Sequence, residues 1–131
     1  MRRTAATALI ASALAALVAL GAASSASASL GGRSVQLRYC WSTSVFNPRC
    51  PLATLPLSAN GTVNNMPGSS WTETPTALVI DFVNPSATVT RTTYSGTLVP
   101  GSTQPCFRGT MTATRLLAPP TMNGVWQGCA V

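Results

Sequence analysis

Histidine and lysine are both absent from this 131-residue chain, and its only acidic residues are Glu73 and Asp81. Without histidine, the chain lacks the commonest general base and every nucleophile system that depends on an imidazole. Without lysine, it can form neither a Schiff base nor a serine–lysine pair. Two carboxylates could hydrolyse a sugar bond, but the pattern favours an ion pair of Asp81 with Arg91 and a solvated Glu73 in a loop. The composition therefore predicts a protein that is not an enzyme and needs no cofactor.

Residues suited to binding a metal ion are equally scarce. The chain has four cysteines, Cys40, Cys50, Cys106 and Cys129. Zinc sites place cysteines in close pairs such as Cys-x-x-Cys and often add histidine. The long spacings here, in a chain without histidine, predict that no metal is bound.

Residues 1–28 have a composition of their own. Arg2 and Arg3 precede an uncharged stretch over 5–23 in which larger apolar residues are set among alanines, and Ala26-Ser27-Ala28 then gives a small-x-small sequence. This order is typical of a secretory signal peptide. A membrane anchor would need about 20 strongly apolar residues, whereas alanine dominates this stretch. We expect residues 1–28 to be a cleaved signal peptide and residues 29–131 to be a small secreted β domain, extracellular or periplasmic, without a stable membrane anchor.

Export bears directly on the cysteines. All four lie after residue 28, their number is even, and an exported chain meets an oxidising compartment, so two disulfides are expected. The exported part carries six arginines against the two acidic residues, a net charge of +4. These arginines are scattered along the chain, which favours a solvated surface over a specific nucleic-acid site.

The chain after residue 28 is typical of short strands and turns, because threonine, valine, serine, proline and glycine dominate and no helical period of apolar residues persists. Residues 64–70 are expected to form a loop, and Asn60-Gly61 predicts the turn of a small hairpin. The strands are expected at 35–41, 52–57, 76–83, 87–94, 104–116 and 125–131.

An aromatic-x-glycine pattern occurs three times near the C-terminus, at 94–96, 107–109 and 126–128. An aromatic ring opposite a strand glycine covers the bare backbone of that glycine. A fold at Gly101-Ser102 would set Tyr94 opposite Gly109 and Gly96 opposite Phe107.

A second fold near residues 117–118 would set Phe107 opposite Gly128 and Gly109 opposite Trp126. The same register sets Cys106 opposite Cys129, close enough for a disulfide. We therefore predict the pairs Cys106–Cys129 and Cys40–Cys50. Tyr94, Phe107, Met111 and Trp126 should then share the inner face.

These elements predict an all-β fold: a small antiparallel meander of about six or seven strands that closes into a barrel or sandwich. The pattern resembles the up-and-down barrels of the lipocalin and avidin kind, although neither family's signature motif is present.

Three residues stand out as candidates for binding. Trp71 lies in a polar stretch and is either a stacking platform or a loop residue folded over the rim of the core. Trp41 adjoins Cys40 and alternates with apolar residues, which favours the core. Arg49 lies between two prolines in a loop that the Cys40–Cys50 bridge would close, and in general style this loop resembles the reactive loops of serine protease inhibitors.

Three functional hypotheses follow. The first is a non-catalytic secreted binding or structural module whose partner is an extracellular protein, a glycan or a small apolar ligand. The second is a secreted serine protease inhibitor that uses the loop around Arg49. The third is a small hydrolase that uses Glu73 and Asp81.

Overall fold

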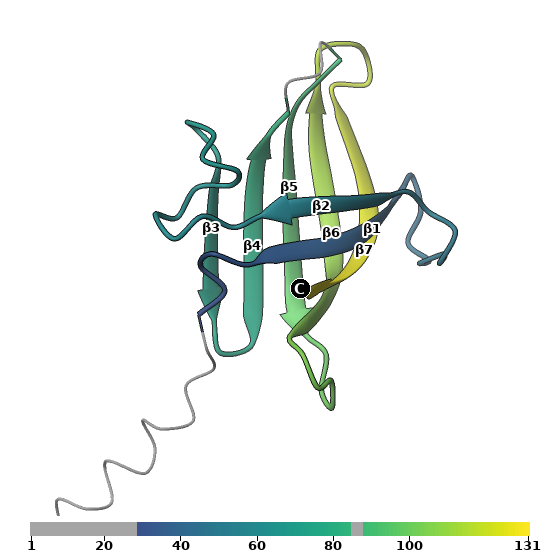
Figure 1. Ribbon diagram of the computed structural model, residues 1–131. Helices are drawn as coiled ribbons and strands as arrows, with labels where there is room; N and C mark the ends of the chain where they lie inside the picture. Colours follow the sequence, from purple (N-terminus) through teal and green to yellow (C-terminus); the bar gives the residue numbers. More distant parts are fainter. Residues whose placement is uncertain (1–28, 85–87) are drawn as a thin grey trace, which may run out of the picture.

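The fold is all-β and consists of one antiparallel sheet (Figure 1). The computed structural model describes residues 29–84 and 88–131, and the expected signal peptide lies outside them. Within the described residues no helix is present. The seven strands are β1 (Ser34–Trp41), β2 (Leu52–Pro56), β3 (Ser70–Thr74), β4 (Ala77–Val83), β5 (Val89–Leu98), β6 (Cys106–Arg115) and β7 (Thr121–Ala130).

The strands follow the order β2-β1-β7-β6-β5-β4-β3. Strands β3 to β7 form the predicted meander, and the β1–β2 hairpin joins it because β1 pairs with β7. The sheet curls into a half-barrel, so that β1 and β2 cross in front of the other strands in Figure 1. The two edges of the sheet are therefore β2 and β3.

The concave face of the sheet encloses the core. Strands β1 and β2 with the segments beside them contribute aliphatic side chains, and β4 to β7 contribute most of the aromatic ones. Because both sets are almost fully buried, side chains fill the interior of the half-barrel. The cluster consists of Leu30, Val35, Leu37, Leu55, Leu57, Val63, Leu78, Ile80, Tyr94, Phe107, Met111, Trp126 and Ala130.

The gap between the edge strands β2 and β3 is bridged by the segment that connects them. The predicted Asn60-Gly61 turn is present there, and it closes a small hairpin in which Leu57 pairs with Val63. The backbone N–H of Trp71 in β3 donates to the Gly61 carbonyl oxygen at 3.0 Å. The segment thus contacts the β3 edge through this hydrogen bond.

Some strand boundaries differ from the prediction. Strand β3 was not predicted, because Ser70–Thr74 reads as a polar stretch; its inward positions are filled by Trp71 and Glu73. Strand β5 extends four residues beyond the expected end at 94, and β7 begins four residues before the expected start at 125. In each case pairing with a neighbouring strand prolongs the element.

The β6–β7 register is confirmed: Phe107 pairs with Gly128, Gly109 with Trp126, and Cys106 with Cys129. The β5–β6 register was wrong by two residues, since Tyr94 pairs with Met111 and Gly96 with Gly109. The loop that joins these strands is longer than a fold at Gly101-Ser102 implies, because the last hydrogen bond runs from Val99 N–H to the Cys106 carbonyl oxygen.

A shift of two residues keeps every side chain on its predicted face. Tyr94, Phe107, Met111 and Trp126 are all buried on the inner face. The ring of Trp126 reaches across β6 and lies against Gly96 of β5, where a Cβ atom would collide with it. The tryptophan therefore covers Gly96 of β5, and not Gly109, the residue of β6 directly opposite it.

Both predicted disulfides are present. Cys40 is bonded to Cys50, with Cα atoms 5.4 Å apart, and Cys106 is bonded to Cys129. The first bridge closes the loop between β1 and β2, and the second joins two adjacent strands of the sheet. In the ranges 29–84 and 88–131, no helix is long and apolar enough to cross a membrane.

Candidate functional site

The loop over residues 42–50 leaves the sheet at Trp41, returns at β2 and is closed by the Cys40–Cys50 bridge. Several hydrogen bonds hold it in one shape. The Arg38 guanidinium donates from Nη1 to the Cys50 carbonyl oxygen at 2.9 Å, and the backbone N–H of Cys50 donates to the Asn47 carbonyl oxygen at 3.0 Å. The loop is therefore a fixed part of the surface.

Arg49 lies at the end of this loop and is exposed. Its backbone N–H donates to Oδ1 of Asn47 at 2.9 Å, and with the Asn47–Cys50 hydrogen bond this makes residues 47–50 a tight turn. Asparagine favours such turns because its side chain can accept from the backbone two residues on. The guanidinium is accessible, but the backbone that presents it is turned and not extended.

A hollow of about 630 Å³ opens between this loop and the end of β1. Its walls are mainly aromatic and apolar. The rings of Tyr39 and Trp41 form one side, with centroids 6.4 Å apart in an edge-to-face arrangement. The loop provides the other side through Val45, Phe46 and Pro48.

Two of the three candidate residues, Trp41 and Arg49, therefore lie at one loop. Trp41 is half-buried and packs against the core with one part while it borders the hollow with another. The sequence pointed to both residues but missed Tyr39, Val45 and Phe46. The signal for Val45 and Phe46 was the presence of apolar side chains inside a disulfide-closed loop, where polar ones are the rule, whereas Tyr39 lies in β1 and its alternation with other apolar residues indicated only a strand.

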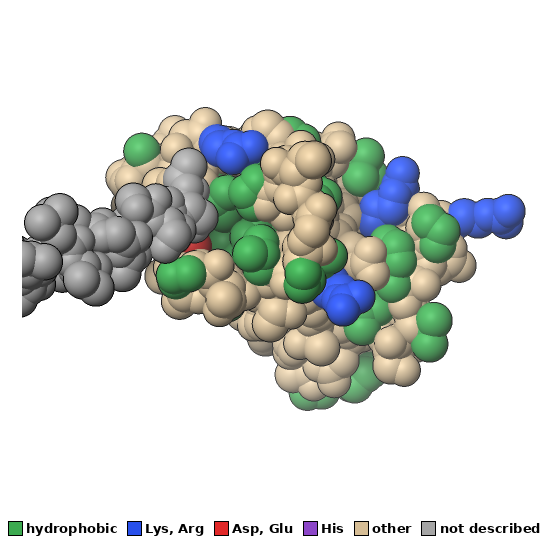
Figure 2. Space-filling model, turned by 90° about the horizontal axis from the view of Figure 1, so that it is seen from below, with side chains coloured by type: hydrophobic (Ala, Val, Ile, Leu, Met, Phe, Trp, Pro, Cys, Tyr) green, Lys and Arg blue, Asp and Glu red, His purple; other side chains and the backbone are tan. Residues whose placement is uncertain are grey.

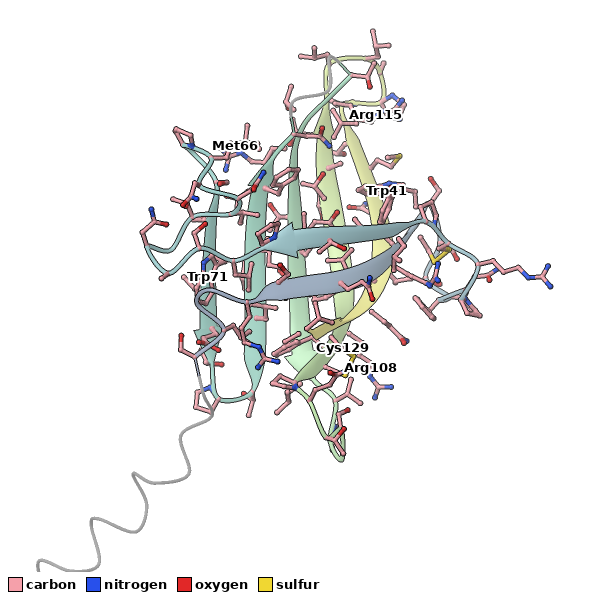
Figure 3. The ribbon with its side chains drawn as sticks, in the orientation of Figure 1. Trp41, Met66, Trp71, Arg108, Arg115 and Cys129 are labelled. Atoms are coloured by element: carbon pink, nitrogen blue, oxygen red, sulfur yellow. A yellow bond between two sulfur atoms is a disulfide. The ribbon has the colours of Figure 1, made fainter. Side chains whose placement is uncertain are left out.

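Trp71, the third candidate, lies apart from the other two. Figure 3 shows it on β3, across the sheet from Trp41. The expectation of a loop position was wrong: Trp71 is half-buried in a strand, and its Nε1–H donates to the Ser58 carbonyl oxygen at 2.9 Å. The ring covers the rim of the core and ties β3 to the bridging segment.

The two carboxylates point to opposite faces of the sheet. Glu73 shares the inner face with Trp71, whereas Asp81 follows the inward-facing Ile80 and so points outward. The expected solvated loop position of Glu73 was wrong, because this residue lies in β3 and its Oε1 accepts the backbone N–H of Leu30 at 2.9 Å. The structure does not bring the carboxylates together.

Asp81 makes the predicted ion pair with Arg91, and its other oxygen accepts from the Thr93 hydroxyl at 3.3 Å. Across residues 29–84 and 88–131, no three cysteine, aspartate or glutamate side chains come together in a group that could hold a metal ion.

A smaller hollow, of about 230 Å³, lies where the β3–β4 turn meets the β5–β6 loop. Figure 2 views the molecule from this end and shows apolar side chains gathered near the middle, with arginines around them. Leu30, Leu98 and Phe107 line it together with three prolines, and Glu73 is its only charged residue.

Burial also affects one titratable group of the core. Loss of solvent raises the pKa of Tyr94 from 10.0 to about 12, with a smaller contribution from the phenolate of nearby Tyr39. The Tyr94 ring lies edge-on to Trp126, with centroids 5.7 Å apart. The hydroxyl is therefore neutral at ordinary pH.

Comparison with known proteins adds no further assignment to this geometry. No protein-family model matches the chain, and neither the curated proteins nor the solved structures give a match.

Proposed function

We propose that this chain is a non-catalytic binding module that acts outside the cytoplasm and meets a protein partner through the 42–50 loop and the adjacent Tyr39–Trp41 hollow. The observation that carries the proposal is the hollow itself. It is open, largely apolar and aromatic, and formed in part by a loop that a disulfide holds in place. Interfaces between proteins are enriched in aromatic anchors set in such surroundings.

Preorganisation is the physical advantage of this arrangement. A flexible loop loses conformational freedom when it binds, and that loss weakens the complex. Here the Cys40–Cys50 bridge and the turn at residues 47–50 have already restricted the loop. Val45 presents an aliphatic side chain that is 70% exposed and lines the hollow together with Phe46 and Pro48, so that it adds to one continuous apolar surface.

Selection from a peptide display library on the mature domain tests the proposal. We expect the selected peptides to lose at least ten-fold in affinity against Val45→Asp. The matched control is Leu117→Asp, since Leu117 is 61% exposed on the β6–β7 connection. Peptides that bind both variants as well as the unaltered domain would overturn the proposal.

Inhibition of a serine protease is the second candidate, and the exposure of Arg49 in a closed loop favours it. A reactive loop binds its protease as an extended strand, so the hydrogen bonds of the 47–50 turn would first have to break. We therefore place it behind the first candidate. Inhibition of a trypsin-like protease that disappears in Arg49→Ala would reverse the order.

A further inference from the structure

The outer face of the sheet beside the same loop carries a row of polar and cationic side chains. Gln127 of β7 pairs with Arg38 of β1 on one side and with Arg108 of β6 on the other. Adjacent strands lie about 4.8 Å apart, which places the Cα atoms of the two arginines about 10 Å from each other. We call Arg38, Gln127 and Arg108 the arginine row.

Phe46 of the 42–50 loop stands beside this row and divides the surface in two. A hollow of about 280 Å³ on one side is bordered by Arg38 and Gln127, and a hollow of about 450 Å³ on the other by Arg108 and Gln127. Phe46 lines both of them, and Val45 lines the second. The row therefore has an apolar ridge next to its two charges.

The charge of this face is not balanced within the described part of the chain. Asp81 is engaged by Arg91 on the β4–β5 side of the sheet, and Glu73 points to the inner face. Arg38 is oriented by its hydrogen bond to the Cys50 carbonyl oxygen. Arg108 is exposed and makes no hydrogen bond or ion pair with any described residue.

We infer that the arginine row and the Phe46 ridge bind an extended, acidic segment of the partner protein. This inference rests on the proposed function, because the 42–50 loop contributes to both surfaces. A guanidinium binds a carboxylate through two parallel N–H···O bonds, which makes arginine selective for this group. In an extended segment of polyproline II form, which has about three residues per turn and a rise of about 3.1 Å per residue, carboxylates three residues apart lie on the same side and are separated by about 9 Å, close to the spacing of the row.

The residues between the two carboxylates would meet the rest of the row. The amide of Gln127 can both donate to and accept from a peptide backbone. The Phe46 ring offers apolar contact to an aliphatic side chain. An acidic segment with an aliphatic residue between its carboxylates therefore fits this face better than a uniformly charged one.

The test measures fluorescence anisotropy of the mature domain with a labelled peptide, Ser-Asp-Val-Leu-Asp-Ser. Its counterpart has both aspartates replaced by asparagine. At low salt we expect the acidic peptide to bind at least ten-fold more tightly than the neutral one. Arg108→Gln should weaken acidic-peptide binding about five- to ten-fold, and adding Arg38→Gln should abolish it.

Arg115→Gln is the matched control, because it removes the same charge from the opposite end of β6 (Figure 3). Arg108 has no partner among residues 29–84 and 88–131, so Arg108→Gln should leave the unfolding curve unchanged. Equal binding of the two peptides, or an equal loss in Arg115→Gln, would overturn the inference. So would tighter binding of a sulfated oligosaccharide or of anionic phosphatidylserine vesicles through the same two arginines.

The two proposals can fail separately. The selected peptides could lose affinity in Val45→Asp, carry no acidic residues and keep their affinity in Arg108→Gln. That result would support the binding module and contradict the acidic partner. If acidic peptides respond to Arg108→Gln but not to Val45→Asp, the arginine row binds them without the loop, and the proposed function falls.

Discussion

Trp126 fills the core, donates a hydrogen bond to the backbone and covers a strand glycine, and a smaller residue could not do all three. It is fully buried, and its Nε1–H lies 3.1 Å from the Thr110 carbonyl oxygen and 3.2 Å from that of Ser95. The ring reaches across β6 to β5 because Gly96 leaves room for it, and a Cβ atom at Gly109 would collide with the backbone of Ser95 and Gly96. A buried indole needs a partner for its N–H, and here the backbones of β5 and β6 supply one.

Tyr94 makes the stability of the fold dependent on pH at the alkaline end. Its pKa is about 12 in the folded chain and 10.0 for a solvated tyrosine, so the unfolded chain releases this proton first. The stabilisation is fully present below pH 10 and is lost as the pH rises from 10 to about 12. The expected loss is about 2 to 3 kcal/mol in the free energy of unfolding.

Urea unfolding at pH 9 and at pH 11.5 measures this loss, with Tyr94→Phe as the control. The variant keeps the buried ring but has no proton to release, so its free energy of unfolding should fall less over the same interval. Ultraviolet titration gives an independent check, since the chain has only two tyrosines. Parallel pH dependence in the two proteins would contradict the raised pKa of Tyr94.

Single residues were predictable from the sequence where their partners lie close in the chain or directly across a strand. The ion pair of Asp81 with Arg91 joins the adjacent strands β4 and β5, ten residues apart in the sequence, and was predicted. Glu73 and Trp71 were placed in a loop, because their partners are Leu30, 43 residues away, and Ser58. No pattern in the neighbouring sequence indicates contacts between residues so far apart along the chain.

At the scale of elements, residue composition and turn signals were enough to locate six of the strands, and the aromatic-glycine pattern was enough to assign the faces of the last three. These signals were not enough for the β5–β6 register, which depends on the length of a loop rich in Pro, Gly and Ser. The β6–β7 register was found because the disulfide and the aromatic-glycine pairs both constrain it. Two independent constraints distinguish registers that alternation alone leaves equivalent.

The two disulfides are expected to stabilise different parts of the molecule. Each should contribute about 3 kcal/mol to the free energy of unfolding, because the closed loops differ little in the logarithm of their length. Replacing Cys106 and Cys129 by alanine should therefore weaken the whole sheet. Replacing Cys40 and Cys50 should in addition release the 42–50 loop, with faster amide hydrogen exchange at its turn.

Urea unfolding and hydrogen exchange of the two double variants separate these effects. The informative amide is that of Cys50, or alanine at that position, because its N–H donates across the turn to Asn47. This amide should lose its protection from hydrogen exchange when Cys40 and Cys50 are replaced and keep it when Cys106 and Cys129 are replaced. Equal loss in both variants would mean that the loop is not held locally by its own disulfide.

At the scale of the whole molecule, the predicted meander is present but its closure differs from a simple barrel. The first strand, β1, pairs with the last, β7, in the interior of the sheet. The opening between the edge strands β2 and β3 is covered by a segment with little regular structure. A closed barrel of this size would hide all its edges. Here the connecting segment covers part of the β3 edge instead, because its Gly61 carbonyl oxygen accepts the backbone N–H of Trp71.

The expected export of the chain can be checked by mass spectrometry of the intact protein. We expect the protein recovered outside the cytoplasm to begin near Ser29 and to be lighter than the reduced chain by four hydrogens, two for each disulfide. Leu30 is buried in the core, so cleavage a few residues later would remove a stabilising side chain. An intact residue 1–28 segment on the exported protein would contradict the expected cleavage.

The position of β7 has a consequence for the time course of biosynthesis. Of the seven strands, β7 is the last to be synthesised, yet it lies in the interior of the sheet between β1 and β6. Until residues 121–130 arrive, the growing chain has four open strand edges where the finished sheet has two. Open edges invite aggregation, so a product that ends before β7 would be removed quickly, and only a chain that includes β7 would persist.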